Sequence, residues 1–122
     1  MKTRILIIDD EAPVRDMLRQ MLEKEGYEVV EAPEGNAGIR LFRDNPTDLV
    51  ITDILMPDKE GIETILELQK TFPQVKIIAI SGGGRIKLNV LPVAKAFGAL
   101  RTLAKPFERK ELLEAVRAVL AQ

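Results

Sequence analysis

Four short apolar runs in this sequence each end in a polar residue that could handle a phosphate group or a divalent metal ion. These polar residues are Asp9 and Asp10 after the first run, Asp53 after the second, Ser81 after the third and Lys105 after the fourth. In an open parallel sheet, the loops at the carboxyl ends of the strands converge on one crevice. We therefore expect three carboxylates, a hydroxyl group and an ammonium group to share one small site.

The three carboxylates of this expected site would repel one another, and a divalent cation would relieve the repulsion. Mg2+ commonly binds one or two carboxylates together with waters and phosphate oxygens. The Lys105 ammonium group and the Ser81 hydroxyl group could each contact a phosphate oxygen. These residue types favour phosphoryl transfer, in which positioning and charge neutralisation supply most of the catalysis. Because the sequence has no histidine, a carboxylate is the natural nucleophile and would form an acyl phosphate.

Each of these residues, taken alone, has a simpler interpretation. An Asp-Asp pair after a strand is usually a turn or a helix cap. Ser81 before three glycines is usually part of a loop, and Lys105 before a proline is usually a solvated lysine. The occurrence of such residues at four strand ends is stronger evidence than any one of them.

Length and composition restrict the protein class. A chain of 122 residues suits one domain, and its net charge of -1 argues against a broadly basic surface that binds nucleic acid. The sequence has no cysteine or histidine, so any metal must bind through oxygen. No signal peptide precedes the first strand-like run and no apolar stretch approaches membrane-spanning length, so we expect a cytoplasmic protein without a membrane partner.

Strand-like runs alternate with segments of helical period, which predicts an α/β protein with a doubly wound parallel sheet. Continuous apolar runs are typical of central parallel strands, whereas the run at 27–31 alternates in part and suits an edge strand. The five predicted strands cover residues 4–8, 27–31, 49–52, 76–80 and 101–104.

Helices are predicted between and after these strands, over residues 13–25, 34–44, 60–70 and 108–121. A further helix either begins near Leu91, with Pro92 in its first turn, or begins at Arg85 and is kinked at Pro92, and we favour the later start. The residues expected to face the core are Val14, Leu18, Met21 and Leu22; Ala37, Leu41 and Phe42; Ile62, Ile65 and Leu66; and Leu112, Leu113, Val116, Val119 and Leu120.

Four segments together resemble the receiver domain of two-component response regulators, over residues 4–120. They are Ile-Ile-Asp-Asp-Glu at 7–11, Asp-Ile-Leu-Met-Pro-Asp-Lys-Glu-Gly at 53–61, Ser-Gly at 81–82 and Lys-Pro-Phe at 105–107. The resemblance implies a flavodoxin-like (βα)5 fold with five parallel strands in the order 2-1-3-4-5. It also implies that residues 1–122 form a single receiver domain, and we expect no effector domain.

The same resemblance implies a role for each site residue. Asp53 would accept a phosphoryl group from a sensor histidine kinase or a phosphotransfer protein. Asp10, Asp53 and the backbone carbonyl of Leu55 would bind Mg2+, and Asp9 would assist through water. Ser81 and Lys105 would contact the phosphoryl oxygens, and the peptide bond before Pro106 would be cis. The protein would catalyse only its own phosphorylation and dephosphorylation.

Signalling in the family uses the surface formed by the fourth helix, the fifth strand and the fifth helix. A downstream protein or a second copy of the chain would bind there. The position three before the lysine, usually aromatic in the family, is Thr102 here. We therefore expect phosphorylation to order the loop at 82–91 more than to rotate a ring. Met17 on the first helix is either a contact for the phosphodonor protein or a core residue.

Three functions of other classes would share part of this pattern. A flavin carrier would place phosphate against the acidic residues 9–11, which would repel it. A phosphohydrolase with an aspartyl nucleophile typically has a second acid two residues later, where this chain has Leu55, and needs a cap. The main alternative is a receiver-like module that works without phosphorylation, through protein interaction or dimerisation.

Overall fold

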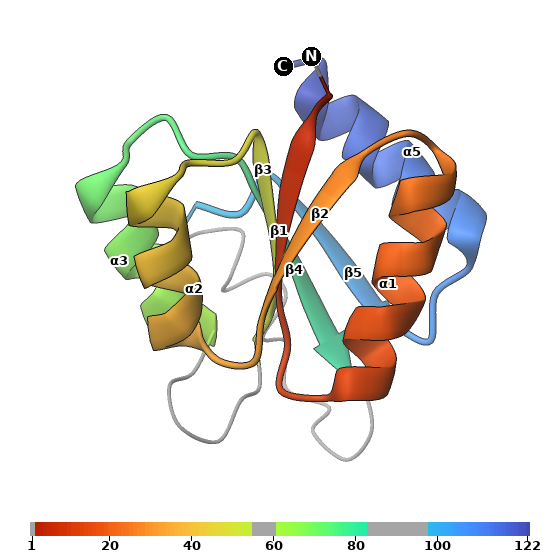
Figure 1. Ribbon diagram of the computed structural model, residues 1–122, viewed down its shortest axis with the longest axis horizontal. Helices are drawn as coiled ribbons and strands as arrows, with labels where there is room; N and C mark the ends of the chain where they lie inside the picture. Colours follow the sequence, from red (N-terminus) through yellow and green to blue (C-terminus); the bar gives the residue numbers. More distant parts are fainter. Residues whose placement is uncertain (1, 55–60, 83–97) are drawn as a thin grey trace.

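The computed structural model describes residues 2–54, 61–82 and 98–122. Within them the chain forms one sheet of five parallel strands, with helices on both faces (Figure 1). The strands, in the sheet order β2-β1-β3-β4-β5, confirm the predicted α/β class, the predicted strand order and the edge position of the second strand. Their bounds are β1 (Arg4–Ile8), β2 (Glu28–Ala32), β3 (Leu49–Asp53), β4 (Ile77–Gly82) and β5 (Arg101–Lys105).

The helices cover the sheet in two pairs. On one face pack α1 (Ala12–Lys24) and α5 (Arg109–Leu120), and on the other pack α2 (Gly35–Asp44) and α3 (Gly61–Thr71) (Figure 1). The bounds of these elements agree with the predicted ones to within one or two residues. The helix expected to begin near Leu91 lies outside the described residues.

The strand β1 shows why the apolar runs are continuous. Ile5 and Ile7 pack in the core under α1 and α5, and Leu6 and Ile8 pack in the core under α2 and α3. All four side chains are fully buried. Because successive side chains of a strand point to opposite faces, a strand covered on both sides must be apolar at every position.

Two of the predicted core residues are on the surface instead. Leu41 is 38% exposed and Leu66 is 42% exposed, so the prediction that they are buried is wrong. In α2 the buried positions include Ile39 and Phe42, and in α3 they include Leu68. Successive residues of a helix are about 100° apart, and Leu41 and Leu66 fall outside the arc that faces the sheet. The other predicted core residues are buried or partly buried.

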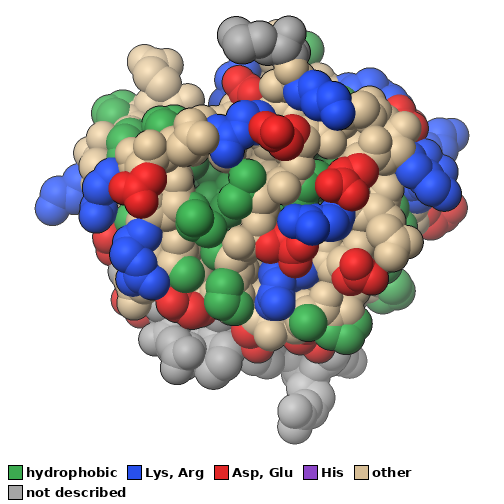
Figure 2. Space-filling view, in the orientation of Figure 1, with side chains coloured by type: hydrophobic (Ala, Val, Ile, Leu, Met, Phe, Trp, Pro, Cys, Tyr) green, Lys and Arg blue, Asp and Glu red, His purple; other side chains and the backbone are tan. Residues whose placement is uncertain are grey.

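The surface carries charges of both signs. Figure 2 shows acidic and basic side chains interspersed on the face seen there, with hydrophobic side chains between α2 and the β2 edge. Among the described residues, the large hydrophobic side chains that are most exposed are Met17, Leu41 and Leu66. No helix in the described part of the chain combines the length and the apolar character needed to cross a bilayer.

Candidate functional site

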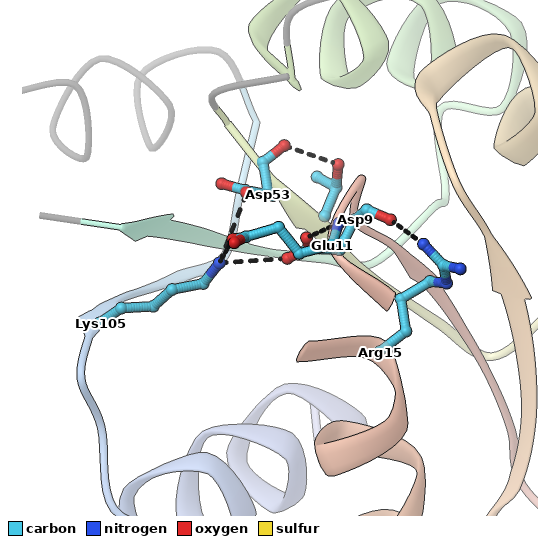
Figure 3. Close-up of polar contacts among 6 residues, drawn as sticks. Asp9, Glu11, Arg15, Asp53 and Lys105 are labelled. Carbon is cyan, nitrogen blue, oxygen red and sulfur yellow. Dashed lines mark hydrogen bonds and ion pairs between the residues drawn. The ribbon is translucent and has the colours of Figure 1, made fainter. Parts of the chain in front are cut away.

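The carboxyl ends of the strands bring four of the predicted site residues to one edge of the sheet. Figure 3 shows Asp9, Asp53 and Lys105 among them. Asp9 follows β1, Asp53 ends β3 and Lys105 ends β5. Ser81 is buried in β4, directly after Ile80, the residue that pairs with Asp53. The Nζ atom of Lys105 lies 3.2 Å from Asp9 Oδ2 and 3.5 Å from Asp53 Oδ2. The expected convergence is therefore confirmed for Asp9, Asp53 and Lys105.

Asp9 is the most deeply buried acid of this group, with 1% of its surface exposed. The Glu11 N–H donates to Asp9 Oδ1 at 2.9 Å, and Lys105 Nζ donates to Oδ2 at 3.2 Å. Burial raises the pKa of Asp9 above its ordinary value of 3.8, although both contacts favour the carboxylate and oppose the rise. Both carboxylate oxygens of Asp9 thus accept hydrogen bonds within the protein.

Asp53 is 5% exposed at the point where β3 ends. Its carbonyl oxygen accepts a hydrogen bond from Thr52 Oγ1 at 3.1 Å. The next residue, Ile54, donates its N–H to the Ile80 carbonyl at 2.9 Å and accepts the Gly61 N–H at 2.7 Å. A Cβ atom at position 61 would overlap the Asp53 carbonyl oxygen. Glycine therefore lets α3 begin directly against the strand end that carries Asp53.

Two exposed acids complete an acidic cluster at the site, which consists of Asp9, Asp10, Glu11 and Asp53. One carboxylate oxygen from each lies within 4.8 Å of the others. Glu11 is an addition to the three predicted carboxylates. Because all four groups offer oxygen, the cluster fits the ligand preference of Mg2+. Leu55, whose carbonyl was predicted as a further ligand, lies outside the described residues.

Lys105 supplies positive charge to the acidic cluster. Besides Asp9 and Asp53, its Nζ atom contacts Glu11 Oε1 at 3.7 Å, and the side chain is 17% exposed. Burial alone would lower the pKa of Lys105, but Asp53, Asp9 and Glu11 together outweigh it, so the pKa lies above 10.5. The lysine is therefore charged at neutral pH. Its peptide bond to Pro106 is cis, as the resemblance implied.

Arg15, which the sequence analysis did not single out, contacts the site through the main chain. Its Nη1 atom donates to the Asp9 carbonyl oxygen at 2.8 Å (Figure 3). Its Nε atom donates to Glu31 Oε1 at 3.1 Å. The one available signal was its position in the first turn of the predicted helix, four residues after Glu11. Its pairing with Glu31 depends on how α1 packs beside β2, which no local pattern reveals.

Two other predictions concern the surroundings of the site. Thr102 lies in β5, where it pairs with Ala79 and is half-buried. The loop whose ordering was predicted falls almost wholly outside the described residues, since nothing is described at 83–97. Met17 is 39% exposed and lines a groove of about 380 Å³ with Pro13, Met21 and Arg109 among others, so it is a surface residue and not a core residue.

Comparison with known protein families finds a match over most of the chain. The model of the response regulator receiver domain matches residues 5–117. The chemotaxis protein CheY of Thermotoga maritima is 38% identical over 120 residues, which are 98% of this chain and 98% of that protein. The transcriptional regulatory protein CpxR of Escherichia coli K12 is 35% identical over 117 residues, which are 96% of this chain and 49% of CpxR. The chain thus spans about half the length of CpxR.

Solved structures show the same similarity in three dimensions. A CheY-like response regulator receiver domain protein from Methanospirillum hungatei matches with a TM-score of 0.91 and 32% identity, over 99% of this chain and 95% of that one. The response regulator TrrA from Thermotoga maritima, solved in complex with Mg2+ and BeF, matches with a TM-score of 0.84 and 34% identity. That match covers 98% of this chain and 99% of TrrA.

Proposed function

The chain belongs to the response regulator receiver domain family, and from this premise we propose that Asp53 accepts a phosphoryl group in a Mg2+-dependent reaction. The observation that carries the proposal is the position of Asp53. Its carboxylate lies 3.5 Å from the Lys105 ammonium group and within the acidic cluster. The phosphodonor would be a sensor histidine kinase or a phosphotransfer protein, as in two-component signalling.

In the proposed reaction, the Asp53 carboxylate is the nucleophile. One of its oxygens forms a bond to the phosphorus of a phosphohistidine on the donor protein, and the phosphorus–nitrogen bond breaks. The imidazole nitrogen keeps that electron pair and takes a proton from solvent, so no further reactant is needed. The products are an acyl phosphate on this chain and a free histidine on the donor.

The acidic cluster is proposed to hold the Mg2+ ion. Asp10 and Asp53 would hold it through their carboxylates, the Leu55 carbonyl would add a ligand, and Asp9 would assist through a water molecule. When bound, the ion neutralises charge that builds up on the phosphoryl oxygens. The oxygen-only ligand set supports this assignment, and so does the Mg2+ and BeF complex of the related TrrA.

Lys105 and Ser81 are proposed to bind the transferred group. The Lys105 ammonium group, which contacts Asp53 at 3.5 Å, is within reach of a phosphoryl oxygen on that carboxylate. Ser81 lies one residue beyond the strand partner of Asp53, so its hydroxyl group could bind another oxygen. These two groups would offset the negative charge that phosphorylation adds to the site.

The output is proposed to pass through the family's signalling surface, which includes β5 and α5, to a downstream protein or a second copy of the chain. The groove beside Met17 on α1 is proposed as the contact for the phosphodonor protein. The chain would work in the cytoplasm and catalyse only its own phosphorylation and dephosphorylation. Thr102 in place of an aromatic residue supports a switch that orders the loop after β4.

Intact mass tests this function directly. The protein is incubated with MgCl2 and acetyl phosphate, and the same incubation is repeated with EDTA and with the variants Asp53→Asn and Asp16→Asn. Asp16 is an exposed acid of α1, so Asp16→Asn is the matched charge control. We expect one phosphoryl group on the wild type and on Asp16→Asn, and none on Asp53→Asn or in EDTA.

The absence of any mass increase would overturn the proposal, provided that a phosphoramidate donor and a beryllofluoride binding test had also failed. That result would favour the phosphorylation-independent interaction module, and the next measurement would be the oligomeric state of the protein. The burial of Asp9 and Asp53 argues against this alternative. Burying clustered carboxylates lowers the stability of the fold, and a module that only binds other proteins would gain nothing from them.

A further inference from the structure

We propose that Arg15 is a positioning residue for the Mg2+ site, because it fixes the peptide group that joins Asp9 to Asp10. This inference rests on the proposed function, and it assigns a part of that function to a residue outside the acidic cluster. Arg15 reaches the site from α1 and bonds the main chain, so it does not touch the metal or the phosphoryl group. Its proposed effect is on where Asp10 points.

The contacts of Arg15 fix the orientation of its planar guanidinium group. Nη1 donates to the Asp9 carbonyl oxygen at 2.8 Å (Figure 3), whereas Nε donates to Glu31 Oε1, outside that view, at 3.1 Å. The side chain is only 18% exposed. A planar group with acceptors on two of its edges is fixed more strongly than a lysine ammonium group would be, since the ammonium group rotates freely about a flexible stem.

The main chain of Asp9 is held at both of its polar groups. Its N–H donates to the Ala32 carbonyl at 3.2 Å, and its carbonyl accepts from Arg15. The Asp9 carbonyl and the Asp10 N–H belong to one planar peptide group. Without Arg15 this plane could rotate, and the exposed Asp10 carboxylate would then leave the position beside Asp53 from which the two would hold a cation.

Glu31 compensates for the charge that Arg15 brings close to a cation site. Its Oε1 atom pairs with Arg15, and its Oε2 atom lies 2.8 Å from Arg19 Nε. A positive charge near the site repels Mg2+, so its removal should tighten metal binding by simple electrostatics. If Arg15 positions Asp10, the change in Mg2+ affinity has the opposite sign, since loss of Arg15 should weaken metal binding. The two explanations can therefore be separated by the direction of the effect.

The test compares Arg15→Met with Arg19→Met. Both variants remove one positive charge from α1 and one partner of Glu31, but only Arg15 bonds the Asp9 carbonyl. The dissociation constant for Mg2+ is measured by titrating MgCl2 into the full chain and following amide NMR shifts, without a phosphodonor. We expect Arg15→Met to bind Mg2+ about 10-fold more weakly, the lower end of the usual effect of groups that orient metal ligands. Arg19→Met should stay within about twofold, as expected for a more exposed ion pair.

Two further measurements are needed: the Mg2+ affinity of Arg15→Lys, and the unfolding free energy of each variant without metal. Arg15→Lys keeps the charge, so its affinity should lie between those of the wild type and Arg15→Met, and it carries the test if Arg15→Met does not fold. Urea unfolding in EDTA shows whether lost stability alone explains the loss of affinity. A variant that is fully folded at the titration temperature but binds Mg2+ weakly supports positioning.

The outcomes separate this inference from the proposed function. If the wild type binds Mg2+ and Arg15→Met binds it equally well or more tightly, the positioning role is wrong and the metal site stands. If Arg15→Met and Arg19→Met lose the same affinity, the effect comes from the lost pairing with Glu31 or from packing, which both variants share, and the role is again wrong. If the wild type itself binds no Mg2+, the proposed function falls and this inference falls with it.

Discussion

Lys105 Nζ lies 3.2 Å from Asp9 Oδ2, although 96 positions separate the two residues in the sequence. Asp9 is almost fully buried, and its pKa is raised because burial outweighs the contacts that favour its charge. Lys105 is therefore one of the groups that favour the charged form of the buried Asp9 when no metal is bound. Each partner therefore alters the free energy of ionising the other.

Removal of Lys105 should destabilise the metal-free protein. In Lys105→Met, Asp9 loses the charged donor to its Oδ2 atom, and a buried charged group without its partner costs about 1–3 kcal/mol of unfolding free energy. The loss should be smaller when Asp9→Asn is already present, because a neutral amide needs the lysine less. Urea unfolding of the two single variants and the double variant in EDTA measures this coupling, and strictly additive effects would contradict it.

Asp9→Asn should raise the unfolding free energy of the metal-free protein at neutral pH. Since burial raises the pKa of Asp9 in the folded state, folding binds a proton, and the charged form of Asp9 disfavours the folded state above that pKa. The advantage of Asp9→Asn should therefore shrink as the pH falls through the folded-state pKa toward 3.8. Unfolding curves of both proteins over this pH range in EDTA provide the check, and a gap that widens toward acid would rule the argument out.

Mg2+ should stabilise the wild type specifically. A ligand that binds only the folded state at 100 times its dissociation constant adds about 2.7 kcal/mol to the unfolding free energy. Asp10→Asn should reduce this gain, because Asp10 is a proposed ligand. Thermal unfolding with MgCl2 is compared with NaCl of equal ionic strength, and an equal shift in the two salts would mean general screening and no bound ion.

Gly61→Ala should damage the site through the backbone. The new Cβ atom would overlap the Asp53 carbonyl oxygen, so α3 or the end of β3 must shift. We expect a loss of about 1–3 kcal/mol, as for other overpacked positions, and slower phosphorylation of Asp53 by acetyl phosphate.

Gly26→Ala is the control for this variant. Gly26 has a φ of +90°, and a Cβ atom added there would meet nothing within 4 Å, so alanine introduces backbone strain without a steric clash. It should lower stability and leave the rate of phosphorylation unchanged. A similar decrease in rate in both variants would show that lost stability, and not the position of Asp53, causes the effect.

Much of the fold followed from local patterns in the sequence. Apolar runs such as 5–8 predicted central strands, and the polar residue after each run predicted which side chains would meet. These signals are local, because side-chain periodicity and the residues that end a strand or helix act over only a few positions. Leu41 and Leu66 are two positions at which these local signals gave a wrong prediction of burial. Both continue an apolar pattern, yet each lies on the outer side of its helix.

The sequence by itself determined the class of fold, the residues at the strand ends and the oxygen-only chemistry of the site. The tertiary structure decided that Asp9 is buried while Asp10 is exposed, that Glu11 joins the acidic cluster, and that Arg15 bonds the Asp9 carbonyl. The physical reason is that burial and pairing depend on how helices rotate and pack against the sheet. That packing is set by contacts between residues far apart in the chain, which the local pattern does not contain.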